Sequence, residues 1–253
     1  MKPLENKIII STRPLANDDT MKKSLIEKGA TVLDFPMIKI VTNELNAEIR
    51  SALANINTFQ WLLFTSKNGV NSFFGMYKNN YGEIAVLQPR IAVIGQATAN
   101  EVLKNGYNPE FISTGNTSED FIEELRNKIG NNDQILIALG ELADTKFEKE
   151  LATIAAVTRL NVYKTIETKA HSLEIIKRIV KNDYDMLVFT SPSGFRNFVK
   201  IMAENNYNEN FKIACIGKTT EKEVLNLGYT PLIVSKKSSG DSFTLEIEHY
   251  FKK

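Results

Sequence analysis

The stretch LVFTSPSGF at residues 187–195 has a near copy, LLFTSKNGV, at residues 62–70. Each copy has an apolar run, then a turn of small polar and glycine residues, then apolar residues at helical spacing. These helical positions are Val70, Phe73, Phe74 and Tyr77 in one copy and Phe195, Phe198, Val199 and Met202 in the other. The pattern predicts a strand, a tight turn and a helix, present twice in the chain.

The duplication extends beyond this pair. IAVIGQATANEVLKNGYNP (91–109) parallels IACIGKTTEKEVLNLGYTP (213–231), and the segment 7–36 aligns more weakly with 134–163, which sets Pro36 opposite Tyr163. Apolar runs alternate with amphipathic segments throughout. We therefore predict an α/β fold with parallel sheets that are covered by helices on both faces.

The composition limits the kinds of partner. The 253 residues are 43% hydrophobic, enough for a substantial core, and suit one or two domains. Because 31 basic and 30 acidic residues leave a net charge of +1, no overall field attracts nucleic acid or an anionic membrane. The apolar run Ile8–Ile10 is too short for a signal peptide, and no segment approaches the roughly 20 apolar residues of a membrane helix. We expect a soluble, cytoplasmic protein.

Metal and thiol chemistry have few residues to use. Cys215 is the only cysteine, so no disulfide can form within the chain, and His171 and His249 are the only histidines. None has a second histidine or cysteine at ligand spacing. We expect no metal and no cofactor, and an inert core role for Cys215.

Ligands of parallel sheets sit beyond the carboxyl ends of the strands, where helices begin. Four such turns carry hydroxyl, amide or glycine residues: Thr65, Ser66, Asn68, Gly69, Gly95, Thr98, Ser191, Ser193, Gly194, Gly217, Thr219 and Thr220. Their backbone N–H groups predict sites for carboxylate or phosphate. Serine and threonine are also ordinary helix caps, so a structural role is the alternative for every turn.

Two further side chains are candidates. Arg13 follows the first strand and could hold a carboxylate with both arms of its guanidinium, or be solvated. Tyr163 ends the extended run 160–163, and its phenol could donate a hydrogen bond to a departing oxygen, or be a buried tyrosine with a satisfied hydroxyl. The chain has no G-x-G-x-x-G motif or Walker lysine, and no catalytic triad or paired carboxylates can be assembled.

Taken in order, the motifs of this chain resemble those of the uroporphyrinogen-III synthase family. They are TRP early in the chain, FTSKNGV, IGQATA, VYKT, FTSPSG, and IGKTT with GYTP after it. The resemblance implies two flavodoxin-like or Rossmann-like α/β/α domains, joined by two antiparallel linker strands, with the active site in the cleft between them. Residues 1–40 and 168–253 would form the first domain and residues 41–167 the second.

The resemblance also implies an activity. Members of the family close hydroxymethylbilane, a linear tetrapyrrole with eight carboxylates, to uroporphyrinogen III, with inversion of ring D, loss of water and no cofactor. Tyr163 matches the tyrosine proposed to assist departure of the hydroxyl. Ser191 and Thr220 match residues of the binding cleft, with Ser66 and Thr98 as their equivalents in the other domain. The small-molecule substrate would be the only partner of a monomer.

A rival interpretation is a non-catalytic binding or regulatory protein whose two domains close on a polyanionic ligand, because a fold does not fix a function. Turnover of the substrate separates the two hypotheses.

Overall fold

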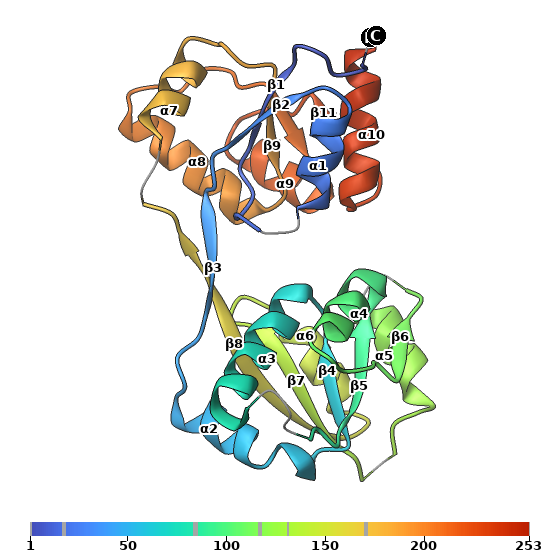
Figure 1. Cartoon of the computed structure of the whole chain (residues 1–253). Helices are drawn as coiled ribbons and strands as arrows, with labels where there is room; N and C mark the ends of the chain where they lie inside the picture. The colour runs from blue at the N-terminus through green and yellow to red at the C-terminus, as the bar shows by residue number, and fades with distance from the viewer. Residues whose placement is uncertain are drawn as a thin grey trace. The chain divides into compact units, whose positions relative to one another are not determined.

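A computed structural model describes residues 2–16, 19–82, 86–115, 118–130, 132–169 and 172–252. The chain divides into two compact units (Figure 1). Unit 1 combines Met1–Lys39 with Ile166–Lys253, and unit 2 is Ile40–Thr165. Unit 1 is therefore built from both ends of the chain, and unit 2 is inserted between them.

Unit 1 has a five-stranded parallel sheet made of β1 (Ile8–Ser11), β2 (Thr31–Asp34), β9 (Met186–Phe189), β10 (Ile213–Cys215) and β11 (Ile233–Val234). The strand order is β11-β10-β9-β1-β2. The β1–β9 pair joins segments far apart in the sequence: Ile10 lies opposite Leu187 of β9 on one side and opposite Leu33 of the neighbouring β2 on the other.

The helices of unit 1 are α1 (Thr20–Glu27), α7 (Leu173–Val180), α8 (Pro192–Glu204), α9 (Lys218–Asn226) and α10 (Gly240–Phe251). They cover both faces of the sheet, with α1 and α10 on one side and α7 and α8 on the other (Figure 1). Alternate residues of the strands contribute side chains to the apolar clusters on the two faces of the sheet. Phe189 packs with helices α7, α8 and α9, whereas Val188 packs with α1 and α10.

Unit 2 has a six-stranded sheet made of β3 (Ile38–Thr42), β4 (Trp61–Phe64), β5 (Arg90–Ile94), β6 (Phe111–Ser113), β7 (Gln134–Gly140) and β8 (Ala156–Glu167). The strand order is β3-β8-β7-β4-β5-β6, and the strands from β8 to β6 are parallel. The α/β class with mostly parallel sheets, predicted from the alternating pattern, is confirmed.

The helices of unit 2 again form two layers. Helices α2 (Ala47–Ala54), α3 (Lys67–Tyr81) and α4 (Gly95–Lys104) pack on one face, together with the short 3-10 helix at Ile56–Thr58. Helices α5 (Ser118–Arg126) and α6 (Lys146–Leu151) pack on the other. The helical positions expected from the repeat lie in the core, since Phe73 and Phe74 of α3 and Phe195 and Phe198 of α8 are fully buried.

The repeat accounts for the topology of both units. When repeat partners are matched, the order β2-β1-β9-β10-β11 in unit 1 corresponds to β8-β7-β4-β5-β6 in unit 2. The units are nevertheless not the two halves of the sequence. The two copies of the repeat exchange their first two strands. Strands β1 and β2 of the earlier copy join the later copy in unit 1, whereas β7 and β8 of the later copy join the earlier copy in unit 2.

The division between the units falls within β3 and β8, which are neighbours in one sheet. These strands run antiparallel: the Asn43 N–H donates to the Val162 carbonyl at 3.0 Å, and the Thr168 N–H donates to the Met37 carbonyl at 3.1 Å. Among the described residues, no helix combines the length and the apolar character needed to cross a membrane.

The domain boundaries expected from the resemblance, at 40/41 and 167/168, stay a prediction about independent folding. We expect a fragment of residues 40–165 to unfold cooperatively on its own, because it contains two complete apolar clusters. A fragment of residues 1–126, of equal length, should not fold, since it follows the sequence repeat and lacks β7 and β9, the partners of β4 and β1. Thermal unfolding followed by circular dichroism tests both. Cooperative unfolding of 1–126 but not of 40–165 would contradict this division.

Candidate functional site

Two equivalent turns begin helices α3 and α8. Ser66 and Ser191 are the N-caps, with almost identical extended backbones. The Ser66 Oγ accepts from the Gly69 N–H at 3.2 Å, and the Ser191 Oγ accepts from the Gly194 N–H at 3.1 Å. Each cap uses one acceptor position of the hydroxyl and leaves its O–H to donate elsewhere. The structural role raised as the alternative is therefore present, and it does not remove the capacity to bind a ligand.

The glycines of these turns allow close packing. A Cβ on Gly69 would lie 2.9 Å from the Ala138 carbonyl oxygen of β7, so only a glycine lets α3 approach that strand so closely. On Gly194 a Cβ would lie 3.0 Å from the Ser191 Oγ. Asn68 is exposed in the first turn of α3, and the Ser193 Oγ lies 3.4 Å from that of Ser191.

The second pair of turns begins α4 and α9. Gly95 has φ = +72°, a left-handed conformation that favours glycine. A Cβ on Gly217 would collide with the Ser238 hydroxyl, so this turn lies next to the loop before α10. The threonines that follow these glycines differ in exposure, because Thr98 and Thr220 are buried whereas Thr219 is exposed.

Arg13 has partners within unit 1. It follows β1 as expected, but its Nε lies 3.6 Å from Asp19, the N-cap of α1, and its Nη1 lies 3.4 Å from the Met21 sulfur. The side chain is about one third exposed, so the guanidinium is neither fully solvated nor free of a carboxylate. A ligand carboxylate at Arg13 would share it with Asp19.

Tyr163 lies inside strand β8, which continues to Glu167, so the expectation that the extended run ends at this tyrosine is wrong. Its ring covers Gly140, the last residue of β7. A Cβ on Gly140 would lie 2.5 Å from two ring carbons and 2.9 Å from the phenol oxygen. Because Gly69 contacts β7 at Ala138, Tyr163 and the first turn of α3 lie near the same end of that strand.

Gly140 is the residue that sequence reasoning missed. The repeat sets it opposite Arg13, where it looks like the loss of a binding residue. The structure shows instead that the missing side chain makes room for the Tyr163 ring. The sequence does contain a signal for this contact: one predicted strand ends in a glycine, and the next strand carries a large aromatic residue. Only the strand pairing reveals that these two residues meet.

Thr65 lines a cavity of about 130 Å³ in unit 2, near the end of β7 and on the face of the sheet that α5 and α6 cover. Leu139 and Phe147 form its apolar wall, and the charged residues around it are Glu119, Asp144, Lys146 and Glu150. The Lys146 ammonium lies 2.6 Å from Glu119 and 3.7 Å from Glu150, and its hydrogen bond lowers the pKa of Glu119. Three carboxylates around one ammonium disfavour a further carboxylate in this cavity.

The remaining candidates for chemistry are not assembled into a site. Cys215 is buried in β10, and burial raises the pKa of its thiol to about 12, so it is held as the neutral thiol. His171 lies outside the described residues. Within the described part of the chain, no group of three or more His, Cys, Asp or Glu side chains could hold a metal ion.

Comparison with known proteins points to one family. A family model described as uroporphyrinogen-III synthase HemD matches residues 19–244. A relative from Ruminiclostridium josui, named porphyrin biosynthesis protein HemD, is 28% identical over 95% of this chain, which spans 48% of that protein, about half its length. A second relative, from Methanocaldococcus jannaschii, has a protein name that contains uroporphyrinogen-III synthase. It is 27% identical over 89% of this chain and 91% of its own length.

Solved structures share the fold. The uroporphyrinogen-III synthetase of Helicobacter pylori superposes with a TM-score of 0.62 at 18% identity, covering 95% of this chain and 97% of its own. A mutant uroporphyrinogen III synthase of the extremely thermophilic bacterium Thermus thermophilus gives a TM-score of 0.60 at 16% identity, covering 97% and 99%. These likenesses support the two-unit α/β architecture.

The packing of Tyr163 on Gly140 predicts the cost of a methyl group there. We expect Gly140→Ala to destabilise unit 2 by about 1–3 kcal/mol, because the Cβ must displace the ring. In a Tyr163→Ala background the same change should cost little, since the colliding ring is gone. Urea unfolding measures both.

Gly75→Ala is the matched control for this prediction. Gly75 lies in α3 with open space where its Cβ would be, so alanine should stabilise by about 0.5–1 kcal/mol. Equal destabilisation by Gly140→Ala with and without the Tyr163 ring would show that the ring does not set the requirement for glycine.

Proposed function

The chain belongs to the uroporphyrinogen-III synthase family, and on that premise we propose that it closes linear hydroxymethylbilane to uroporphyrinogen III. The observation that carries the proposal is the family match itself, which runs from residue 19 to residue 244 and so includes parts of both units. The enzyme is a cyclising hydro-lyase of haem biosynthesis that inverts ring D and releases one water.

The reaction needs little acid-base chemistry from the protein. Loss of the hydroxymethyl oxygen as water leaves an azafulvene cation, and the electron pair for this ionisation comes from the pyrrole itself. Ring D then attacks through its substituted carbon to give a spiro intermediate, which reopens and recloses with ring D inverted. The protein has to favour this route over direct closure to the unrearranged isomer, mainly by holding the chain in one pose.

Tyr163 is the residue that we assign to the departing water. Its phenol oxygen lies at the Gly140 end of β7 and is a neutral donor that can hydrogen-bond to the hydroxymethyl oxygen as that oxygen gains charge. The side chain is only partly buried. The assignment rests on the resemblance and on this position.

The carboxylates of the substrate are assigned to the four turns at the strand ends. Their helix-start amides and hydroxyls give many weak anion contacts, which suits a ligand with eight carboxylates on a protein with a net charge of +1. Each contact is individually modest, so the proposal predicts that single changes weaken binding gradually. The proposed contact residues are Arg13, Thr65, Ser66, Asn68, Gly69, Gly95, Thr98, Ser191, Ser193, Gly194, Gly217, Thr219 and Thr220. For Thr65 we propose contact with an uncharged part of the substrate, because three carboxylates already surround the cavity that it lines.

We propose in addition that the enzyme acts as a cytoplasmic monomer, with no cofactor and with the tetrapyrrole as its only partner. The near-neutral charge supports the absence of a nucleic-acid or membrane partner.

The proposed activity predicts a specific product. Incubation of the purified protein with freshly made hydroxymethylbilane should give uroporphyrinogen III, which separates from the type I isomer by chromatography after oxidation. The type I isomer alone, at the rate of a protein-free control, would reject the synthase. Tight binding without turnover would favour the non-catalytic alternative.

The assignment of Tyr163 predicts a slower reaction without its hydroxyl. We expect Tyr163→Phe to lower kcat by about tenfold, less than the roughly 10²–10⁴-fold typical of general acid catalysis, because the pyrrole supplies most of the driving force. Tyr77→Phe is the matched control in the same unit, where the hydroxyl donates to the Val86 carbonyl at 3.3 Å. A normal rate for Tyr163→Phe would remove the assigned role.

A further inference from the structure

The pairing of β7 with β8 is irregular beside Tyr163. Along both strands partners advance together up to Leu139 and Asn161, but the next residue, Gly140, pairs with Tyr163, so Val162 is an extra residue in β8. Such a bulge bends a strand and changes the direction of the next side chain. It lies at the position that decides where the phenol points.

The bulge changes the face on which Tyr163 packs. In regular alternation, Tyr163 would share a face with Val157, which packs on the side of α5 and α6. Leu160 and Val162 instead pack on the side of α2, α3 and α4, and Tyr163 joins that same cluster. Two consecutive residues, Val162 and Tyr163, thus contact one core, and the ring reaches Gly140 as a result.

One guanidinium ties this bulge to its surroundings. The Arg159 Nη2 donates to the carbonyls of Gly140 at 3.2 Å and Ala143 at 3.1 Å, and its Nε donates to the Asn161 Oδ1 at 2.9 Å. Its Nη1 lies 3.4 Å from Glu148 of α6, and only 14% of the side chain is exposed. The turn is also closed on itself, because the Ala143 N–H donates to the Gly140 carbonyl at 3.0 Å.

The other side of the bulge is held by backbone and amide contacts. The Glu141 N–H donates to the Tyr163 carbonyl at 3.0 Å, and the Asn43 Nδ2 donates to the Asn161 carbonyl at 2.9 Å and to the Glu141 carboxylate at 3.0 Å. These contacts fix the strand. The Arg159 side chain links both sides of the irregular pair: the bulged segment through Asn161 and the end of β7 through Gly140.

We propose that Arg159 is a positioning residue for the reaction: through the Gly140–Ala143 turn and Asn161 it fixes the bulge that lays the Tyr163 phenol over Gly140. This inference rests on the proposed function. Arg159 acts through Tyr163, and no contact of its own with the substrate is needed. The planar fork of arginine suits two carbonyls and a side-chain amide at once, whereas a lysine offers a single point charge.

The kinetic test is a double-mutant cycle of Arg159→Leu and Tyr163→Phe. We expect Arg159→Leu to lower kcat about tenfold with KM within about twofold of wild type, because the phenol is displaced while the anion-binding turns remain. In the Tyr163→Phe background the same change should lower kcat by less than about twofold. A further tenfold loss in that background would overturn the proposal. An inactive wild-type enzyme would instead reject the proposed function.

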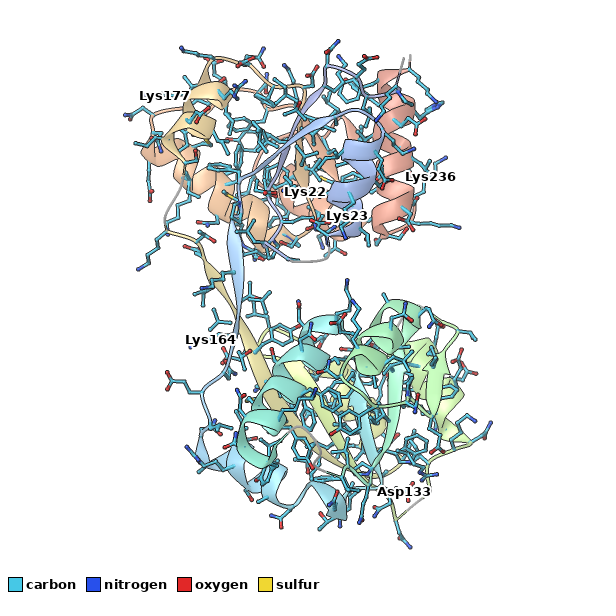
Figure 2. The ribbon with its side chains drawn as sticks, in the orientation of Figure 1. Lys22, Lys23, Asp133, Lys164, Lys177 and Lys236 are labelled. Carbon is cyan, nitrogen blue, oxygen red and sulfur yellow. The ribbon has the colours of Figure 1, made fainter. Side chains whose placement is uncertain are left out.

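Arg90→Leu is the matched control for structural damage. Arg90 is also partly buried in unit 2, where its guanidinium lies 4.1 Å from the Trp61 ring and 3.3 Å from Asp133. It begins β5, at the opposite strand end, and Figure 2 shows Asp133 well apart from Lys164, the neighbour of Tyr163. We expect Arg90→Leu to lower stability but leave kcat unchanged. An equal loss of kcat at equal loss of stability would overturn a positioning role.

Two further measurements separate positioning from folding. The ¹³Cζ resonance of Tyr163, assigned by its absence in Tyr163→Phe, should shift in Arg159→Leu and stay in place in Arg90→Leu, whether or not the protein is active. Arg159→Lys keeps the charge beside Glu148 but not the fork, so we expect it to recover stability while kcat stays about tenfold low. An unshifted resonance in Arg159→Leu, or full kcat in Arg159→Lys, would contradict the proposal.

Discussion

The pairing of β1 with β9 is the constraint on which the architecture depends. It joins segments on either side of the inserted unit, and the Thr12 hydroxyl reinforces it by donating at 2.7 Å to the Val188 carbonyl, 176 positions away. Closing so long a loop costs entropy before any contact forms. The antiparallel strands β3 and β8 reduce this cost once unit 2 has folded, because they bring together Met37, where the chain leaves unit 1, and Thr168, where it re-enters unit 1. Once folded, the inserted unit, which lies between β1 and β9 in the sequence, has its two ends close together.

The duplicated units share a topology but not the same chemistry. Both carry a serine-capped helix after an equivalent strand, so amide-lined turns occur twice. The phenol occurs once, because the repeat sets Pro36 opposite Tyr163. The extra residue in β8 then places Tyr163 on the α3 side of the sheet, where Gly140 leaves room for it. A local irregularity in one unit thus distinguishes that unit from its twin.

The structural role of the serine turns is compatible with the binding role that we propose for them. A capping hydroxyl accepts one backbone N–H and so stabilises the helix by about 0.5–2 kcal/mol, yet it keeps its own proton to donate. The charged groups set stronger limits. Arg13 already faces Asp19, and the carboxylates around Thr65 disfavour an anion in that cavity. The turns are therefore unequal as candidate sites for carboxylates, although their sequences are alike.

The sequence by itself determined the α/β class, the duplication, the strand–turn–helix units and the caps at Ser66 and Ser191, because apolar periodicity and turn residues act over a few neighbouring positions. The family also followed from motifs in order along the chain. Tertiary structure alone decided that Gly140 meets the Tyr163 ring, that Arg159 binds the carbonyls of Gly140 and Ala143, and that β8 continues past Tyr163. These contacts depend on strand register, and one extra residue in a strand changes the face of the side chain that follows it without leaving a periodic signal in the sequence.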